Sequence, residues 1–323
     1  MPTKIPLPPE NTGPEDARWV TLRAKLKWNH LELYKAVYET LFALPAYFKS
    51  SLNITGVLAT DLYTFNAALG ATIENQIVES LNELREAWDP ENKYRLYRFL
   101  RQAQRFPDVI LRSSSPGGEA EVLMGIELKG WYALAKEREP SFRYTVTPAV
   151  CAPWDLLAVY PWALSEVISG QPQLFQPYVV SARYAAEYRN WMWQHGMRSG
   201  GNKNISVSTV NRFYPAKSDM ISDQPASDSG GNFGRIARTR IMDEYMAGLK
   251  REKLSGIPLD AWQRFLSSFR EDRTAESIAR ELDRLVAEVG QSTSSLSAED
   301  IENIRTHLLE IVKILATQQG KAR

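Results

Sequence analysis

The sequence predicts a protein of the α/β or α+β class with a helical C-terminal part. Three observations support this class. Residues 19–48 and 62–88 repeat apolar side chains at three- and four-residue steps, as amphipathic helices do. Residues 108–184 contain four short runs rich in β-branched and aromatic residues, which is typical of strands. The runs are 108–111, 121–128, 155–164 and 177–184. From Arg235 onward the pattern is helical again.

The composition narrows the classes of partner and chemistry. The chain has 323 residues, of which 44% are apolar, which is ample for one large core or a core plus a small appendage. Its net charge of +1 gives no global attraction to nucleic acid or membrane, so any nucleic-acid surface must be local. The single cysteine, Cys151, excludes an internal disulfide and a multi-cysteine zinc site, and three scattered histidines do not predict a metal cluster.

The N-terminal sequence "MPTKIPLPPENTGPED" is polar and Pro-rich and has no apolar signal segment. No later run reaches membrane-spanning length. We therefore expect a cytoplasmic protein, which also agrees with its low cysteine content.

We predict three parts along the chain: a Pro-rich tail at 1–18, a core with surface loops at 19–250, and a helical subdomain at 251–323. In the last part we expect two or three amphipathic helices. One carries Ile278, Leu282, Leu285 and Val289, and the last carries Ile301, Ile304, Leu308, Ile311 and Leu315.

The segment "YRLYRFLRQAQR", residues 94–105, is predicted to continue the preceding helix. As a helix it aligns Arg95, Arg98, Arg101 and Arg105 along one stripe. Such a stripe is usually a solvated face, but beside a phosphate-binding site it favours contact with a nucleic-acid backbone.

The stretch "FPDVILRSSSPGGEAEVLMGIELKGW", residues 106–131, predicts a hairpin around Gly117-Gly118. Asp108 and Glu127 are equally far in sequence from that glycine pair, so a two-residue turn there places them opposite each other. Glu127 and Lys129 share one face of their strand, while Ile126 and Leu128 share the other. The sequence thus predicts two facing carboxylates with a lysine beside them.

Two carboxylates this close repel each other unless a positive charge lies between them. Lys129 is one candidate, and Mg²⁺ is another, because it takes oxygen ligands and commonly binds one or two carboxylates plus phosphate and water. The alternative is an exposed hairpin with a solvated Glu–Lys face. A third acid, Glu74, lies at the border of the apolar stripe of the second helix, where Gly70, one turn earlier, permits close backbone approach. Its alternative is a surface glutamate paired with an arginine.

Pro107-Asp108, the triplet Glu127-Leu128-Lys129 and a preceding helix with Glu74 together resemble the PD-(D/E)XK nuclease superfamily. The resemblance covers roughly residues 62–184, and its motifs are short. It implies a central mixed β-sheet flanked by helices, as in the restriction-endonuclease core. It also implies that Asp108 and Glu127 bind one or two Mg²⁺ ions, that Lys129 assists the attacking water, and that Glu74 completes the catalytic and metal site.

Three further segments are candidates for DNA contact. "RSGGNKN" contains Arg198, Asn202, Lys203 and Asn204, and arginine and asparagine are side chains that read base edges. "SDSGGNFGRIARTR" places Arg235, Arg238 and Arg240 after a glycine-rich loop, where a helix N-terminus could bind phosphate. "YPAKSDMISD" contributes a charged cluster of Lys217, Asp219 and Asp223. The alternatives are an ordinary surface loop for the first, a loop capped by Asp228 or Ser229 for the second, and an ion-pair network for the third.

The expected function is that of a Mg²⁺-dependent, site-specific endodeoxyribonuclease of the type II restriction class acting on double-stranded DNA. Cutting both strands of a palindromic site calls for two active centres, so we expect a homodimer. A structure-specific or repair nuclease with the same chemistry, and a DNA-binding protein that has this fold but does not cleave, are the alternatives.

Overall fold

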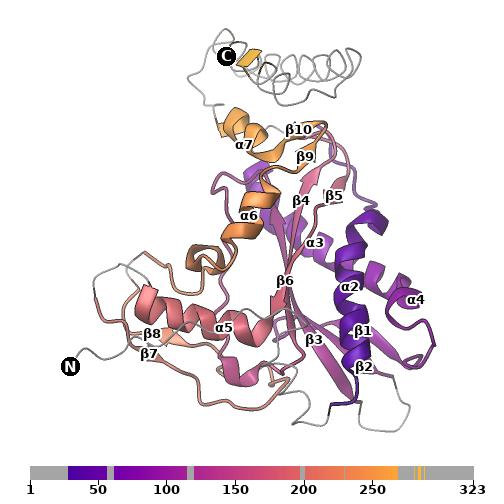
Figure 1. Ribbon diagram of the computed structural model, residues 1–323, viewed down its shortest axis with the longest axis vertical. Helices are drawn as coiled ribbons and strands as arrows, with labels where there is room; N and C mark the ends of the chain where they lie inside the picture. The colour runs from indigo at the N-terminus through magenta and orange to yellow at the C-terminus, as the bar shows by residue number, and fades with distance from the viewer. Residues whose placement is uncertain are drawn as a thin grey trace.

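The computed structural model describes residues 28–56, 62–114, 120–196, 201–228 and 230–267, together with residues 280, 283, 284 and 287. It shows a mixed α/β arrangement in which a curled sheet lies between helices (Figure 1). The predicted α+β class is therefore confirmed at this level.

The helices and strands occupy most of the described chain. The helices are α2 (Leu31–Tyr47), α3 (Leu62–Glu83), α4 (Arg85–Trp88), α5 (Ala182–Trp191), α6 (Asp243–Leu249) and α7 (Leu259–Ser267), with short 3-10 or π turns η1 (Pro148–Val150), η2 (Met192–Gly196) and η3 (Ile236–Thr239). The strands of the main sheet are β1 (Tyr97–Arg101), β2 (Val109–Ser113), β3 (Val122–Tyr132), β4 (Leu156–Leu164), β5 (Pro172–Leu174) and β6 (Tyr178–Ser181). Two small hairpins are β7 (Ile205–Ser206) with β8 (Gln224–Pro225), and β9 (Lys253–Leu254) with β10 (Ile257–Pro258).

The main sheet combines antiparallel and parallel pairing. β1, β2 and β3 are antiparallel neighbours, and β3 runs parallel to β4. The other edge of β4 pairs with β6 along its first half and with β5 along its second half, both antiparallel. All nine residues of β4 are buried, as expected for a strand paired on both edges and covered on both faces.

Helices cover both faces of the sheet. α3 contacts β1 and β3 on one face, and α2 packs against α3 and α4 beside it, whereas α5 lies on the other face against β4 and β6 (Figure 1). The buried core includes Trp88, Trp162 and Trp262, so α7 contributes to the same core as the sheet. No helix among the described segments is long and apolar enough to cross a membrane.

The structure overturns the predicted helix at residues 94–105. That segment forms turns and the edge strand β1, whose residues alternate between the two faces of the sheet. The predicted stripe of Arg95, Arg98, Arg101 and Arg105 is therefore wrong, because a single helical face does not exist there. Five backbone pairings with β2 outweigh the weak local preference for helix.

Two other predicted elements change at their ends. The fourth strand run ends at Ser181, where α5 begins with the Ser181 side chain accepting a hydrogen bond from the Tyr184 amide. Between Arg235 and Ser267 the chain is only partly helical, because the β9–β10 hairpin lies between α6 and α7. The two helices expected within 278–315 lie outside the described residues apart from four positions.

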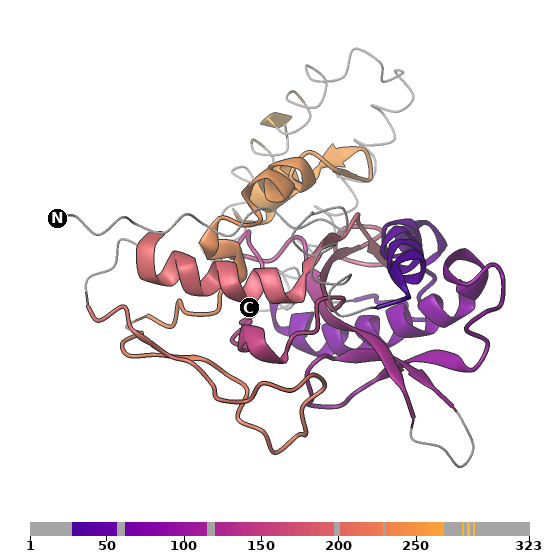
Figure 2. The same cartoon turned by 60° about the horizontal axis from the view of Figure 1, so that its bottom comes forward.

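Residues 201–228, which we call the arm, leave the sheet altogether. The arm carries only the two-residue strands β7 and β8 and runs as long loops below α5 (Figure 2). Three of its apolar side chains are exposed: Val207, Phe213 and Met220. The arm is thus held by a few specific contacts and not by a core of its own.

Candidate active site

The candidate site lies on the edge of β3 where β2 begins. Val109 faces Ile126 and Leu111 faces Met124, and one further step of this register brings Asp108 beside Glu127. This agrees with the predicted hairpin. A bulge between Leu111 and Arg112 then shifts the pairing, so that Arg112 faces Val122, and the turn at Gly117-Gly118 lies outside the described residues.

Beyond Glu127, this edge of β3 has no strand partner among the described residues, and carboxylates take that place. The Leu128 amide donates to Asp108 Oδ2 at 3.2 Å, and the Gly130 amide donates to Glu74 Oε1 at 3.0 Å. Alternate amides of a strand point to the same edge, so residues 128 and 130 offer the two donors that a neighbouring strand would otherwise bind. The backbone amides of β3 therefore orient the side chains of Asp108 and Glu74.

Asp108, Glu127 and Lys129 form one compact charged group. The Lys129 ammonium lies 2.7 Å from Asp108 Oδ2 and 2.9 Å from Glu127 Oε1. The second oxygen of Glu127 accepts the Asp108 amide at 3.2 Å. The strand alternation predicted from sequence is confirmed, since Ile126 and Leu128 are fully buried in the core.

Glu74 reaches this group from α3. The helix lies close to β3, because a methyl group built on Gly130 would be 3.5 Å from Gly70 Cα and 3.8 Å from Glu74 Cγ. The close approach expected at Gly70 is thus confirmed. Arg101, at the end of β1, lies 3.4 Å from Glu74 Oε2, so the site contains three acids and two bases.

The electrostatics of the site follow from burial and crowding. Burial, assisted by the nearby Asp108, raises the pKa of Glu127 to about 7, although Lys129 opposes the rise. Burial also raises the pKa of Glu74, partly offset by the Gly130 amide. Burial alone would lower the pKa of Lys129, but Glu127 and Asp108 together raise it above its ordinary value. Lys129 is therefore a cation at neutral pH.

A small open cavity of about 290 Å³ adjoins the charged group. Glu74, Lys129 and Trp131 line it, with Gly70, Ala71, Gly130, Ser141 and Phe142 completing the wall. The Trp131 indole nitrogen is buried and has no hydrogen-bond partner among the described residues. Sequence analysis missed Trp131, although strand alternation places it on the same face as Glu127 and Lys129.

The donor chemistry suits Mg²⁺ in part. Asp108 and Glu127 present carboxylate oxygens within 2.7 and 2.9 Å of the same nitrogen, so both can reach a shared cation. Mg²⁺ commonly uses one or two carboxylates and completes its shell with water and phosphate. Among the described residues, no three acidic, histidine or cysteine side chains form a group that could hold a metal ion. The residues present therefore fit a Mg²⁺ ion held by two carboxylates, with Glu74 nearby.

The predicted DNA-contact arginines are not all brought together. Arg101 is next to Glu74, whereas Arg98 is on the opposite face of β1. Arg95 and Arg105 are exposed in the turns on either side of the strand.

The structure also removes the predicted phosphate site at a helix start after the glycine-rich loop. η3 has only four residues, and the amides of Asn232 and Phe233 donate to the Asp228 carboxylate. Arg238 pairs with Glu139 at 2.7 Å, and Arg235 donates to the Gly231 carbonyl. Arg240 is exposed at the end of η3. The alternative, a loop capped by Asp228, is the one observed.

The candidates on and beside the arm have mixed outcomes. Arg198 lies outside the described residues, and Lys217 is exposed. The Lys203 ammonium lies 5.1 Å from the Trp193 ring centre, and Asn202 accepts a hydrogen bond from the Asn204 amide at 2.9 Å. Asp219 accepts three hydrogen bonds from Arg212, which favours the ion-pair interpretation for that residue.

No protein-family model matches this chain, and neither a curated protein nor a solved structure shows significant similarity to it. The geometry of the site is therefore the basis on which a function is proposed.

Proposed function

We propose that the protein is a Mg²⁺-dependent endodeoxyribonuclease whose core is of the PD-(D/E)XK, restriction-endonuclease type. One observation carries the proposal: at the edge of β3, Asp108, which directly precedes β2, and Glu127 of β3 both contact Lys129. A purely structural ion pair needs one acid for one base. The excess of acid at a partly exposed sheet edge favours binding of a further cation.

The residues divide the chemistry between them. Asp108 and Glu127 would hold Mg²⁺, and Glu74 would support the site from α3. Bound there, Mg²⁺ would polarise a phosphodiester and lower the pKa of a water nucleophile. Lys129 stays protonated at neutral pH because its neighbours raise its pKa, so its role would be to orient the water or to stabilise negative charge on the phosphate. Arg101 would contact the DNA backbone.

The substrate we propose is double-stranded DNA in the cytoplasm, cut at specific sites by a homodimer in the manner of a type II restriction enzyme. Twofold protein symmetry matches the twofold symmetry of a palindromic site and supplies one active centre per strand. The exposed Asn202 and the half-buried Lys203 of the arm are the candidates for base contact.

The test is cleavage of several unmethylated plasmid and phage DNAs with Mg²⁺ or with EDTA. Asp108→Asn keeps the size of the side chain and removes its charge, while Asp228→Asn makes the same change in the loop before η3. Discrete Mg²⁺-dependent fragments that disappear only with Asp108→Asn would support the proposal. Nicks or a smear would indicate a structure-specific nuclease, and DNA binding without any cleavage would indicate a binding protein.

A further inference from the structure

Asp155 is a fully buried acid that the proposed chemistry does not use. It directly precedes β4, and its carboxylate accepts three hydrogen bonds. Oδ1 accepts the Gly125 amide at 2.8 Å and the Tyr214 hydroxyl at 3.2 Å, and Oδ2 accepts the Ala152 amide at 2.8 Å. A buried carboxylate with three donors holds three segments of chain at one point.

The first of these contacts extends the β3–β4 ladder. The regular pairing of the two strands begins with Ile126 and Leu156, and Gly125 comes one step earlier. The Gly125 amide points toward β4, where the Asp155 side chain accepts it in place of a backbone carbonyl. The start of the pairing between β3 and β4 is therefore fixed by a side chain.

Gly125 in turn fixes the residue before Asp108. A methyl group built on Gly125 would lie 2.2 Å from Pro107 Cγ and 3.0 Å from Asp155 Oδ1, so Pro107 packs directly on the glycine backbone. Asp108 follows Pro107 and hydrogen-bonds to Leu128, three residues after Gly125. Asp155 is thus connected to Asp108 in two steps: a hydrogen bond to Gly125, and the packing of Gly125 against Pro107, which precedes Asp108.

Tyr214 connects the same carboxylate to the arm. Its hydroxyl accepts a hydrogen bond from the Trp154 indole at 2.9 Å and donates to Asp155. Tyr214 has a φ of 52°, a conformation that is uncommon for an aromatic residue and that persists only where surrounding contacts hold it. Phe213 beside it lies edge-on to Trp154, with ring centres 5.9 Å apart.

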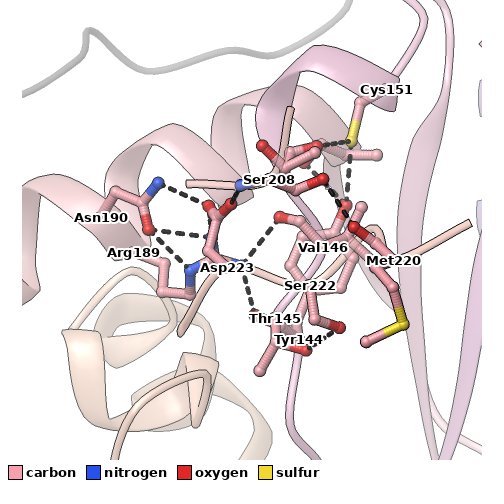
Figure 3. Close-up of polar contacts among 12 residues, drawn as sticks. Tyr144, Thr145, Val146, Cys151, Arg189, Asn190, Ser208, Met220, Ser222 and Asp223 are labelled. Carbon is pink, nitrogen blue, oxygen red and sulfur yellow. Dashed lines mark hydrogen bonds and ion pairs between the residues drawn. The ribbon is translucent and has the colours of Figure 1, made fainter. Parts of the chain in front are cut away.

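The arm is anchored a second time by the ion pair of Arg189 in α5 with Asp223. Figure 3 shows how Asp223 also accepts hydrogen bonds from the Asn190 side chain and the Ser208 amide. Ser208 donates to the Met220 carbonyl, which joins the two halves of the arm near that anchor. The contact between Tyr214 and Asp155 is thus made by a segment that is fixed to α5.

We propose that Asp155 is a positioning residue that couples the arm to Asp108. Through Gly125 and Pro107 it fixes the carboxylate of Asp108 relative to β3, and through Tyr214 it ties that carboxylate to the position of the arm. The functional consequence rests on the proposed nuclease activity: movement of the arm on DNA would alter the geometry at Asp108.

The test measures amide hydrogen exchange by NMR at Asp108 and Leu128, whose amides donate within the candidate site. The variants are Asp155→Asn, which keeps one acceptor oxygen, and Tyr214→Phe, which removes only the hydroxyl. The matched control is Tyr160→Phe, because the Tyr160 hydroxyl is buried and donates to the Leu41 carbonyl in α2 and not to Asp155. The reference amide is that of Ala133, beyond the other end of β3, which donates to the Trp162 carbonyl.

We expect Tyr214→Phe to accelerate exchange at Asp108 and Leu128 about tenfold, through easier local opening, with Ala133 unchanged. Asp155→Asn should do the same to a smaller extent than Asp155→Ala. Unchanged exchange at both site amides in both milder variants overturns the proposal, as does equal acceleration at Ala133. These readouts do not require nuclease activity, so they decide the inference even if the wild type cleaves no DNA.

If the wild type does cleave, Tyr214→Phe should lower the cleavage rate at saturating DNA about tenfold while its affinity for DNA in EDTA stays within about twofold. A variant that loses affinity at an unchanged cleavage rate would contradict the coupling. It would show that Tyr214 serves only to hold the arm.

Discussion

Two charged clusters in this molecule differ in how completely the hydrogen bonds and charges of their members are paired. Arg189 and Asp223 form a pair whose side chains are 1% and 0% exposed. All five N–H donors of Arg189 are used, on the carbonyls of Tyr144 and Val146, on Asp223, and twice on Asn190. The Arg189 guanidinium therefore has no donor left for a ligand, and three donors already occupy the Asp223 carboxylate.

The cluster around Lys129 has the opposite character. Its members are 10% to 24% exposed, and two carboxylates share one ammonium. Glu74 adds a third acid, and Arg101 adds a second positive charge 3.4 Å from it, so the acids outnumber the bases by three to two. Burial without full charge compensation costs free energy, and such a cost is typical of functional sites. We infer that the fully paired Arg189–Asp223 cluster stabilises the fold, and that the incompletely paired cluster around Lys129 is the candidate for chemistry.

The largest expected effect is the loss of activity when the ammonium group of Lys129 is removed. Lys129→Ala should lower the rate of DNA cleavage by about 10²- to 10⁴-fold, because a positioned charge at the reacting centre is lost. Lys136→Ala, at an exposed lysine in the turn after β3, is the control and should retain the wild-type rate. Plasmid cleavage under Mg²⁺ measures both. If Lys129→Ala still cleaves DNA at the wild-type rate, Lys129 has no role in the reaction.

The next effect is on stability and concerns the complete pair. Arg189→Met leaves Asp223 buried and unpaired, and should lower the free energy of unfolding by about 3–5 kcal/mol. Arg212→Met breaks the ion pair with Asp219 at a side chain that is 63% exposed, and should cost at most about 1 kcal/mol. Urea denaturation of both variants makes the comparison. Equal losses would mean that burial does not distinguish the two pairs.

The pH dependence of stability sharpens the contrast further. Burial raises the pKa values of Glu127 and Asp155 to about 7, from ordinary values of 4.5 and 3.8. Between those limits the folded state holds protons that the unfolded state has released, so the free energy of unfolding falls as pH rises. One such group contributes at most about 1.4 kcal/mol per pH unit.

Glu127→Gln should therefore make the fall between about pH 4.5 and 7 shallower, since one of the contributing groups no longer titrates. The control is Glu137→Gln, at an exposed glutamate in the turn after β3, which should leave the slope unchanged. Thermal denaturation across this pH range gives the slopes. A wild-type stability that rises with pH through this window would contradict the raised pKa values.

The smallest expected effect separates two arginines of β1. Arg101→Ala should reduce cleavage by about threefold to tenfold, as loss of one phosphate contact does, and weaken the dependence of DNA binding on salt. Arg98→Ala, on the other face of the same strand, should stay within about twofold. Filter binding at several salt concentrations, with cleavage rates, distinguishes the two. A larger effect of Arg98 would place the DNA on the opposite face.

The sequence was sufficient for the parts of the site that depend on local periodicity. The facing of Asp108 and Glu127 follows from a hairpin register, and the shared face of Glu127 and Lys129 follows from strand alternation. The close approach at Gly70 followed from its place on the helix one turn before Glu74.

What escaped prediction depends on contacts between distant segments. The chain from Tyr94 to Arg105 has helical arginine spacing, yet pairing with β2 makes part of it a strand. The "Tyr-Arg-Phe" alternation at 97–99 was the available signal. The role of Asp155 depends on partners 30 and 59 residues away, and no local pattern indicates those contacts.

The near contact of Gly70 with Gly130 also bears on how the site can move. Where a helix meets a strand almost backbone to backbone, closely packed atoms leave little freedom to slide or tilt, since any shift would drive neighbouring side chains into contact. Glu74 is therefore carried by a stationary part of the molecule. Any adjustment of the site to an incoming ligand would fall to segments outside this contact, among them the arm, which is tied to Asp155 through Tyr214.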